Sequence, residues 1–136
     1  MALDNPKGGM GYAAEFQSSA LPWVTSSTAP SASSPVRYDF PKLTRFITVY
    51  NRDTTTTNTL SFGFTRRGVV SSNNKYILNG GKSETLELRV KSIYLQGETG
   101  NPPFSVCAGL TNIDASVMPL LSETLSNGDA GWLGVG

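Results

Sequence analysis

The sequence predicts an all-β protein of the sandwich or barrel type. Apolar and polar side chains alternate in several short segments, and a period of two is typical of strands with one buried and one solvated face. These segments recur at spacings of about ten residues, separated by clusters of Gly, Pro, Asn, Ser and Thr. No segment of comparable length has helical periodicity. About seven or eight strands without intervening helices indicate a β-sandwich or barrel rather than an α/β fold.

The length and composition suit one folded domain. A chain of 136 residues can bury a core without disulfides. A hydrophobic share of 38% with a charged share of only 15% favours a β protein, or a protein whose surface is covered by neighbours, over a disordered chain. No apolar run approaches the roughly 20 residues of a membrane span, and the N-terminus lacks the apolar core of a signal peptide. We therefore expect a protein made in the cytosol and without a membrane span.

Residues 1–35 are predicted to form a flexible, low-complexity N-terminal arm. Within it, residues 25–35 are all Ser, Thr, Ala or Pro. Such a run cannot bury enough apolar surface to offset the entropy of ordering it. The same segment carries Phe16 and Trp23. The sequence leaves two alternatives for Trp23, which either docks on a neighbouring molecule or packs on its own domain.

The predicted sandwich spans residues 36–113 and begins with three strands. Residues 36–40 alternate and stop at a proline, which cannot donate to a central ladder. Residues 46–50 are rich in β-branched and aromatic side chains, as in a well-covered strand. After a polar loop, residues 60–65 alternate cleanly, and Gly68 lies in the turn that follows.

The second half of the predicted sandwich contains the most regular alternation in the chain, residues 86–91. A short strand at residues 76–78 precedes it. After Lys91 the apolar positions change from even to odd numbers, which predicts a β-bulge. Residues 104–111 form the last predicted strand, in which Cys107 is expected to be a small packing residue rather than a reactive thiol. Residues 114–136 are predicted to be an irregular, Gly-rich tail.

The side chains that most enzymes need are largely missing. The chain contains no His, which removes the commonest general base and the usual zinc ligand. Its single cysteine can form neither an internal disulfide nor, alone, a metal site. Neither glycine motif for phosphate binding occurs between a strand and a helix. We therefore expect no enzymatic activity, no catalytic, cofactor-binding or metal-binding residues, and no cofactor.

Individual charged residues support only weaker alternatives. Glu87 could belong to a carboxylate pair, but the solvated face of a strand explains it better. Asp53 and the threonines beside it could hold calcium, although no loop of the EF-hand type is present. Arg89 and Lys91 would share a strand face with only Tyr94 as a stacking partner, and the net charge is just +1. We therefore expect no nucleic-acid partner.

Three stretches of the sequence follow one another in an order that resembles a known family of proteins. Residues 62–65 end a strand, residues 76–95 contain a Gly-rich turn and an alternating strand, and residues 104–113 contain Ala-Gly-Leu-Thr. Over residues 46–113 this order resembles single jelly-roll capsid proteins of icosahedral double-stranded DNA viruses, including penton proteins, and small phage head-decoration proteins. The resemblance implies a jelly roll of two four-stranded sheets that forms a homopentamer at the fivefold vertices of a virion, with other capsid proteins as partners. It implies no catalytic residues.

Two other functions stay open at this point. One is a minor, cement or head-decoration protein of the same kind of particle. The other is a carbohydrate-binding or receptor-binding sandwich, which would use Tyr38, Tyr76, Tyr94 or Trp132 as stacking platforms. A capsid subunit buries both flanks of its sandwich against other chains, whereas a binding module keeps a concave aromatic site open.

Overall fold

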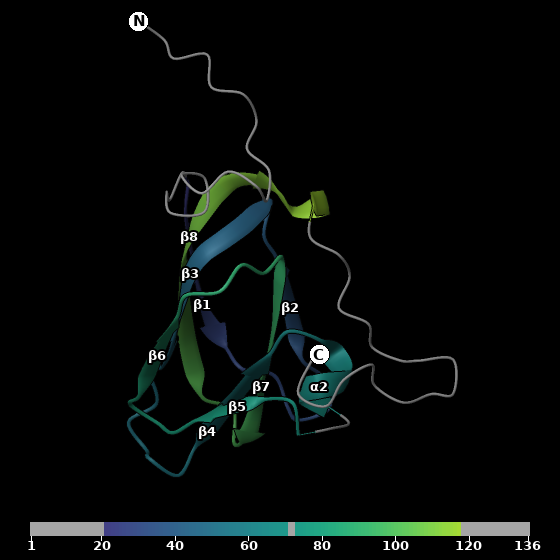
Figure 1. The fold of residues 1–136 in the computed structure, drawn as a ribbon. Coiled ribbons are helices and arrows are strands. Elements are labelled where there is room, and N and C mark those ends of the chain that lie inside the picture. Colours follow the sequence, from purple (N-terminus) through teal and green to yellow (C-terminus); the bar gives the residue numbers. More distant parts are fainter. Residues whose placement is uncertain (1–20, 71–72, 118–136) are drawn as a thin grey trace, which may run out of the picture.

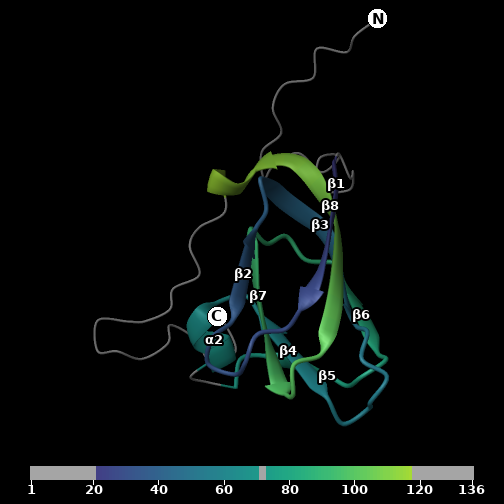
Figure 2. The same ribbon diagram turned by 180° about the vertical axis from the view of Figure 1, so that it is seen from behind.

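The computed structural model describes residues 21–70 and 73–117, which form two antiparallel sheets (Figures 1 and 2). In spatial order the first sheet contains β1 (Leu21–Thr28), β8 (Pro103–Asp114), β3 (Lys42–Asn51) and β6 (Ser83–Leu86). The second contains β2 (Val36–Asp39), β7 (Ser92–Thr99), β4 (Thr59–Gly63) and β5 (Tyr76–Leu78). The predicted all-β sandwich is confirmed.

The strand pairing is that of a single jelly roll. The first strand pairs with the last, the second with the second to last, and so on inward along the chain. The pairs are β1 with β8, β2 with β7, β3 with β6, and β4 with β5. Rolling one long antiparallel hairpin into two sheets produces this pattern. Strands far apart in the sequence thereby become neighbours, so the outer surface of each sheet is assembled from distant segments.

Alternating apolar side chains from both sheets fill the space between them. Ile47 and Phe104 of the first sheet and Leu60 and Leu95 of the second are fully buried. Trp23 also packs on this core, with its ring 4.9 Å from that of Phe40 in an edge-to-face arrangement. The structure therefore decides between the two alternatives for Trp23: it packs on its own domain.

The predicted arm is too long, because the chain is folded from Leu21 onward. Residues 21–28 pair with β8 along their whole length. The connection to β2 is also held: the amide of Ala29 donates to the carbonyl of Pro102 at 2.9 Å, and the amide of Gly97 donates to the carbonyl of Pro30 at 2.8 Å. The Ser/Thr run needs no core of its own because β8 supplies its hydrogen bonds. Residues 1–20 lie outside the described residues.

The predicted strand over residues 86–91 is also wrong. β6 ends at Leu86, and residues 87–91 connect the first sheet to the second. Thr44 holds this connection, since its hydroxyl donates to the carbonyl of Leu88 and accepts a hydrogen bond from the amide of Val90 at 3.0 Å. The change of parity that predicted a bulge therefore marks the change from one sheet to the other.

The described residues contain two short helical segments. Residues 66–70, predicted as a turn and a short apolar pair, form the helix α2 (Arg66–Val70), which packs on β4 and β7 (Figure 1). The hydroxyl of Thr65 accepts a hydrogen bond from the amide of Gly68 at 3.0 Å and so caps this helix. A 3₁₀ turn (Ala115–Val117) follows β8, and the rest of the predicted tail lies outside the described residues. Neither segment has the length and hydropathy that crossing a bilayer requires.

Candidate interaction surfaces

The outward side of the first sheet carries no charged side chain in its three central cross-strand rows, and the Lys42–Asp114 ion pair of this sheet lies beyond them, towards the end of β8. Its middle row contains Val24 on β1, Cys107 on β8, Thr48 on β3 and Thr85 on β6, which are cross-strand neighbours. Val24 is 68% exposed, and the hydroxyls of Thr48 and Thr85 lie 2.9 Å apart in a hydrogen bond. We call this row, together with the row on either side of it, the neutral face.

The two flanking rows of the neutral face are uncharged as well. One contains Ser26, Ser105, Tyr50 and Ser83, and the other contains Pro22, Gly109 and Phe46. Among the described residues no helix lies over this face, whereas α2 covers part of the outward side of the second sheet. Three adjacent uncharged rows at the centre of a sheet face are unusual for a surface in permanent contact with water.

Cys107 has a different environment from the predicted one. Its neighbours Val106 and Ala108 point into the core, so Cys107 points outward and is exposed. The alternation in the sequence agrees with this, because it places Cys107 on the same side of the strand as Ser105 and Gly109. The exposure of Cys107 does not fit the packing role that was expected of it.

A groove of about 380 Å³ opens at the edge of the sandwich where β5 and β6 lie. Its walls are mostly apolar, and they include Phe62, Phe64, Leu86 and Leu88. Tyr76 also lines it, is 47% exposed and lies with its ring 5.4 Å from that of Phe62. The Tyr76 hydroxyl donates to the Glu84 carboxylate at 3.2 Å, and this hydrogen bond together with the negative charge raises the pKa of Tyr76.

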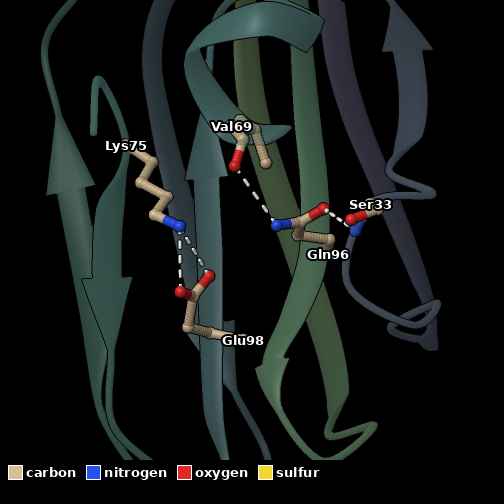
Figure 3. Close-up of polar contacts among 5 residues, drawn as sticks. All are labelled: Ser33, Val69, Lys75, Gln96 and Glu98. Carbon is tan, nitrogen blue, oxygen red and sulfur yellow. Dashed lines mark hydrogen bonds and ion pairs between the residues drawn. The ribbon is translucent and has the colours of Figure 1, made fainter. Parts of the chain in front are cut away.

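A network of buried and partly buried polar groups lies beneath α2 (Figure 3). Gln96 is 2% exposed; its side-chain oxygen accepts a hydrogen bond from the amide of Ser33 at 2.9 Å, and its side-chain nitrogen donates to the carbonyl of Val69 at 3.2 Å. Beside it the ammonium of Lys75 donates to both carboxylate oxygens of Glu98, at 2.8 and 3.0 Å. These groups satisfy one another and join α2, β7 and the β1–β2 connection, so their role is structural.

The Lys75–Glu98 pair should make the stability of the protein depend on pH. The hydrogen bond from Lys75 lowers the pKa of Glu98, against an opposing effect of burial. The stabilisation is therefore present above the pKa of Glu98 in the unfolded chain and is lost as the pH falls through the lower pKa of the folded state. We expect Glu98→Gln to lower the melting temperature at neutral pH and the difference from the unmodified chain to shrink below about pH 4.

The control for this experiment is Glu87→Gln. The side chain of Glu87 is 73% exposed and its carboxylate lies 3.7 Å from Arg45, so its removal should change the melting temperature little at any pH. A Glu98→Gln deficit that stays constant from neutral to acid pH would show that the ion pair does not cause the difference.

Two of the four aromatic residues considered as stacking platforms offer no open ring. Tyr38 is half-buried, with its ring edge-to-face with Trp23 at 5.5 Å and with Phe104 at 6.3 Å. Tyr94 is 8% exposed, and the Arg37 guanidinium lies 5.6 Å from its ring centre. Tyr76 in the groove is the exposed one, and Trp132 lies outside the described residues.

The charged residues considered in the sequence do not gather into a site. Arg89 and Lys91 lie in the connection after β6, so the predicted basic strand face does not exist. Glu87 is solvent-exposed as expected, but in that connection rather than on a strand. The Asp53 carboxylate accepts hydrogen bonds from the amide of Thr55 at 2.8 Å and from the side chain of Asn58 at 3.0 Å, which lowers the pKa of Asp53. No group of three or more metal-ligating side chains occurs in residues 21–70 and 73–117.

Comparisons with known proteins add little to this geometry. No family model matches the chain, and no curated protein matches it. Among solved structures the chain is similar to one from a study of Bacillus endospore appendages, described as a family of disulfide-linked pili, at 9% identity and a TM-score of 0.38. The similarity covers 67% of this chain and 88% of the other.

Proposed function

We propose that this protein is a structural virion protein, a capsid subunit made in the host cytosol, which forms the pentameric vertex of an icosahedral shell. The observation that supports this best is a jelly roll with an uncharged area at the centre of one sheet face. Depletion of charge is typical of protein surfaces that are buried in contacts with other subunits. The low charged share of the whole chain, 15%, agrees with a molecule that is covered by neighbours.

The edges of the sandwich suit a closed ring. The strand order leaves β1 and β2 at one flank and β5 and β6 at the other. Because neighbouring strands of each sheet are antiparallel, a second copy in the same orientation would present its β1 antiparallel to β6 of the first. Head-to-tail contacts of this kind close into rings when the rotation between copies allows it.

The groove beside β5 and β6 supports a second candidate, a binding module for a carbohydrate or a receptor. It is concave and has the exposed ring of Tyr76 in its wall, as a stacking site requires. The groove lies on the flank of the sandwich that a closed ring of subunits would cover. Tyr76→Ala should therefore weaken ligand binding if the module is correct and weaken assembly if the ring is correct.

The first test is the molar mass of the full chain by light scattering over a concentration series. We expect a five-fold mass, or a ten-fold mass where two rings pair, that resists dilution. A second chain that begins at Leu21 asks whether residues 1–20 tie the ring together, and it keeps β1 and the packing of Trp23 intact. A monomer at every concentration, for the full chain alone and after mixing with other shell proteins, would contradict the vertex.

A further inference from the structure

We infer that the neutral face is a contact with a second copy of this chain, packed face to face about a two-fold axis. This contact is separate from the head-to-tail ring, which uses the flanks of the sandwich. It does not depend on the capsid proposal, because it rests on the charges and the cross-strand rows of one sheet.

The first step in the argument concerns the charge of the occupant. A partner that covered Val24, Cys107 and Thr48 with charged side chains would leave those charges buried without counter-charges, which is costly. The occupant must therefore be uncharged over the same area. The outward side of the second sheet does not meet this requirement, since Arg37 and Asp39 stand on it as an ion pair of 2.7 Å.

Another copy of the neutral face does meet the requirement. Three rows of uncharged side chains in one copy can oppose three such rows in the other with no unpaired charge between them. The charged pairs beside these rows, Arg45 with Glu87 at 3.7 Å and Lys42 with Asp114, can stay at the rim of the contact. A surface that is complementary to itself gives an isologous contact, and such contacts have two-fold symmetry.

The side chains on β3 indicate the direction of the two-fold axis. Tyr50 and Phe46 stand in the two flanking rows, on either side of Thr48 in the middle row. An axis along the middle row exchanges the flanking rows, so the Tyr50 ring of each copy meets the Phe46 ring of the other. Aromatic pairs of this kind favour edge-to-face or offset contacts.

The same axis brings the two Cys107 side chains opposite each other. Stacked sheets lie about 10 Å apart, which a short bis-maleimide linker can span between two thiols. Cys107 is exposed and is the only cysteine in the sequence, so the unmodified chain already carries a single reporter at the centre of the proposed contact.

The experiment uses the full chain with its natural Cys107. Treatment with a short bis-maleimide should give a covalent dimer in high yield, and dilution into the monomeric range should abolish it. By light scattering, Cys107→Ser should keep the native mass, because it preserves a small uncharged residue. Cys107→Arg should halve the mass, from ten-fold to five-fold where the ring also forms and from two-fold to a monomer where it does not, because it buries two like charges opposite each other.

Each result separates this contact from the ring. A five-fold mass that is the same for Cys107→Arg and Cys107→Ser, with no cross-linked dimer, would overturn the two-fold contact and leave the vertex proposal standing. A two-fold mass that Cys107→Arg reduces to a monomer, with efficient cross-linking, supports the contact and contradicts the vertex. A monomer in all three chains without cross-linking overturns both.

Discussion

Replacing Asn51 by Leu is expected to lower the free energy of unfolding by about 3–5 kcal/mol, since three backbone groups, one buried and two partly buried, lose their partner. Asn51 ends β3 and is fully buried. Its side-chain nitrogen donates to the carbonyls of Asn58 and Leu78, each at 3.0 Å, and its side-chain oxygen accepts a hydrogen bond from the amide of Asp53 at 3.1 Å. Leu has a similar volume but can make none of these bonds.

The matched control is Asn101→Ala. Asn101 is exposed and makes one hydrogen bond, from its side-chain nitrogen to the carbonyl of Ala29 at 3.0 Å. Its loss should cost about 1 kcal/mol. Guanidinium unfolding of both variants, read as the change in midpoint at a constant slope, gives the comparison. If the free energy of unfolding falls by the same amount in both variants, the three hydrogen bonds of Asn51 do not have the combined effect expected of them.

Replacing Gly97 by Ala is expected to cost about 3 kcal/mol or more, at the upper end of what overpacking does. A Cβ at this position would lie 2.2 Å from the carbonyl oxygen of Gly100 and 3.2 Å from that of Pro30. Both obstacles are backbone atoms, so no side-chain rotation can relieve the clash. Gly97 stands where the register of β7 against β4 shifts, and its amide holds the connection after β1.

Gly81→Ala is the comparison for Gly97→Ala because its cost has a different cause. Gly81 has a φ of +81°, and the nearest atom to its Cβ position is 3.9 Å away. The cost there is conformational and about 1–2 kcal/mol, and Gly81→Asn should recover part of it because Asn tolerates this region. At position 97, replacement by Asn should lower the free energy of unfolding more than replacement by Ala. Chemical unfolding of all four variants checks this order, which an equal loss for Ala and Asn at position 97 would contradict.

The parts of the fold that could be predicted from the sequence are segments in which apolar residues alternate with polar or small ones. Residues 60–63 and 104–110 are examples, because each apolar position there is a core position in the structure. β1 could not be predicted in the same way. Residues 25–28 become a strand because β8 lies beside them, and a partner almost 80 residues away leaves no trace in the local composition.

The segment 86–91 illustrates the opposite error. Its charged and apolar residues alternate as in a strand, yet only Leu86 belongs to one. Thr44 fixes the backbone of this connection through its hydroxyl, and that contact spans 46 residues between Thr44 and Val90. Strand periodicity is therefore compatible with a strand but does not decide whether a ladder partner is available.

The neutral face was hidden in the sequence for a related reason. Val24, Thr48, Thr85 and Cys107 come from four separate segments, and only the register of four strands places them in one row. The one signal available was the small charged share of the chain, which indicated a covered surface without locating it. Asn51 and Gln96 carried no signal at all, since buried and exposed amides look alike in a sequence.

The pairing of β1 with β8 also determines how the molecule responds to mechanical force. Leu21, where the described chain begins, lies opposite Leu110, near the end of β8, so the segments before β1 and after β8 leave from the same end of two adjacent antiparallel strands. A pull applied through both segments loads the hydrogen bonds between these strands one after another, since the bonds lie perpendicular to the strands. The sandwich should therefore unzip at low force from this end, whereas a pull between Leu21 and the loop after β7 would shear the strands and meet greater resistance.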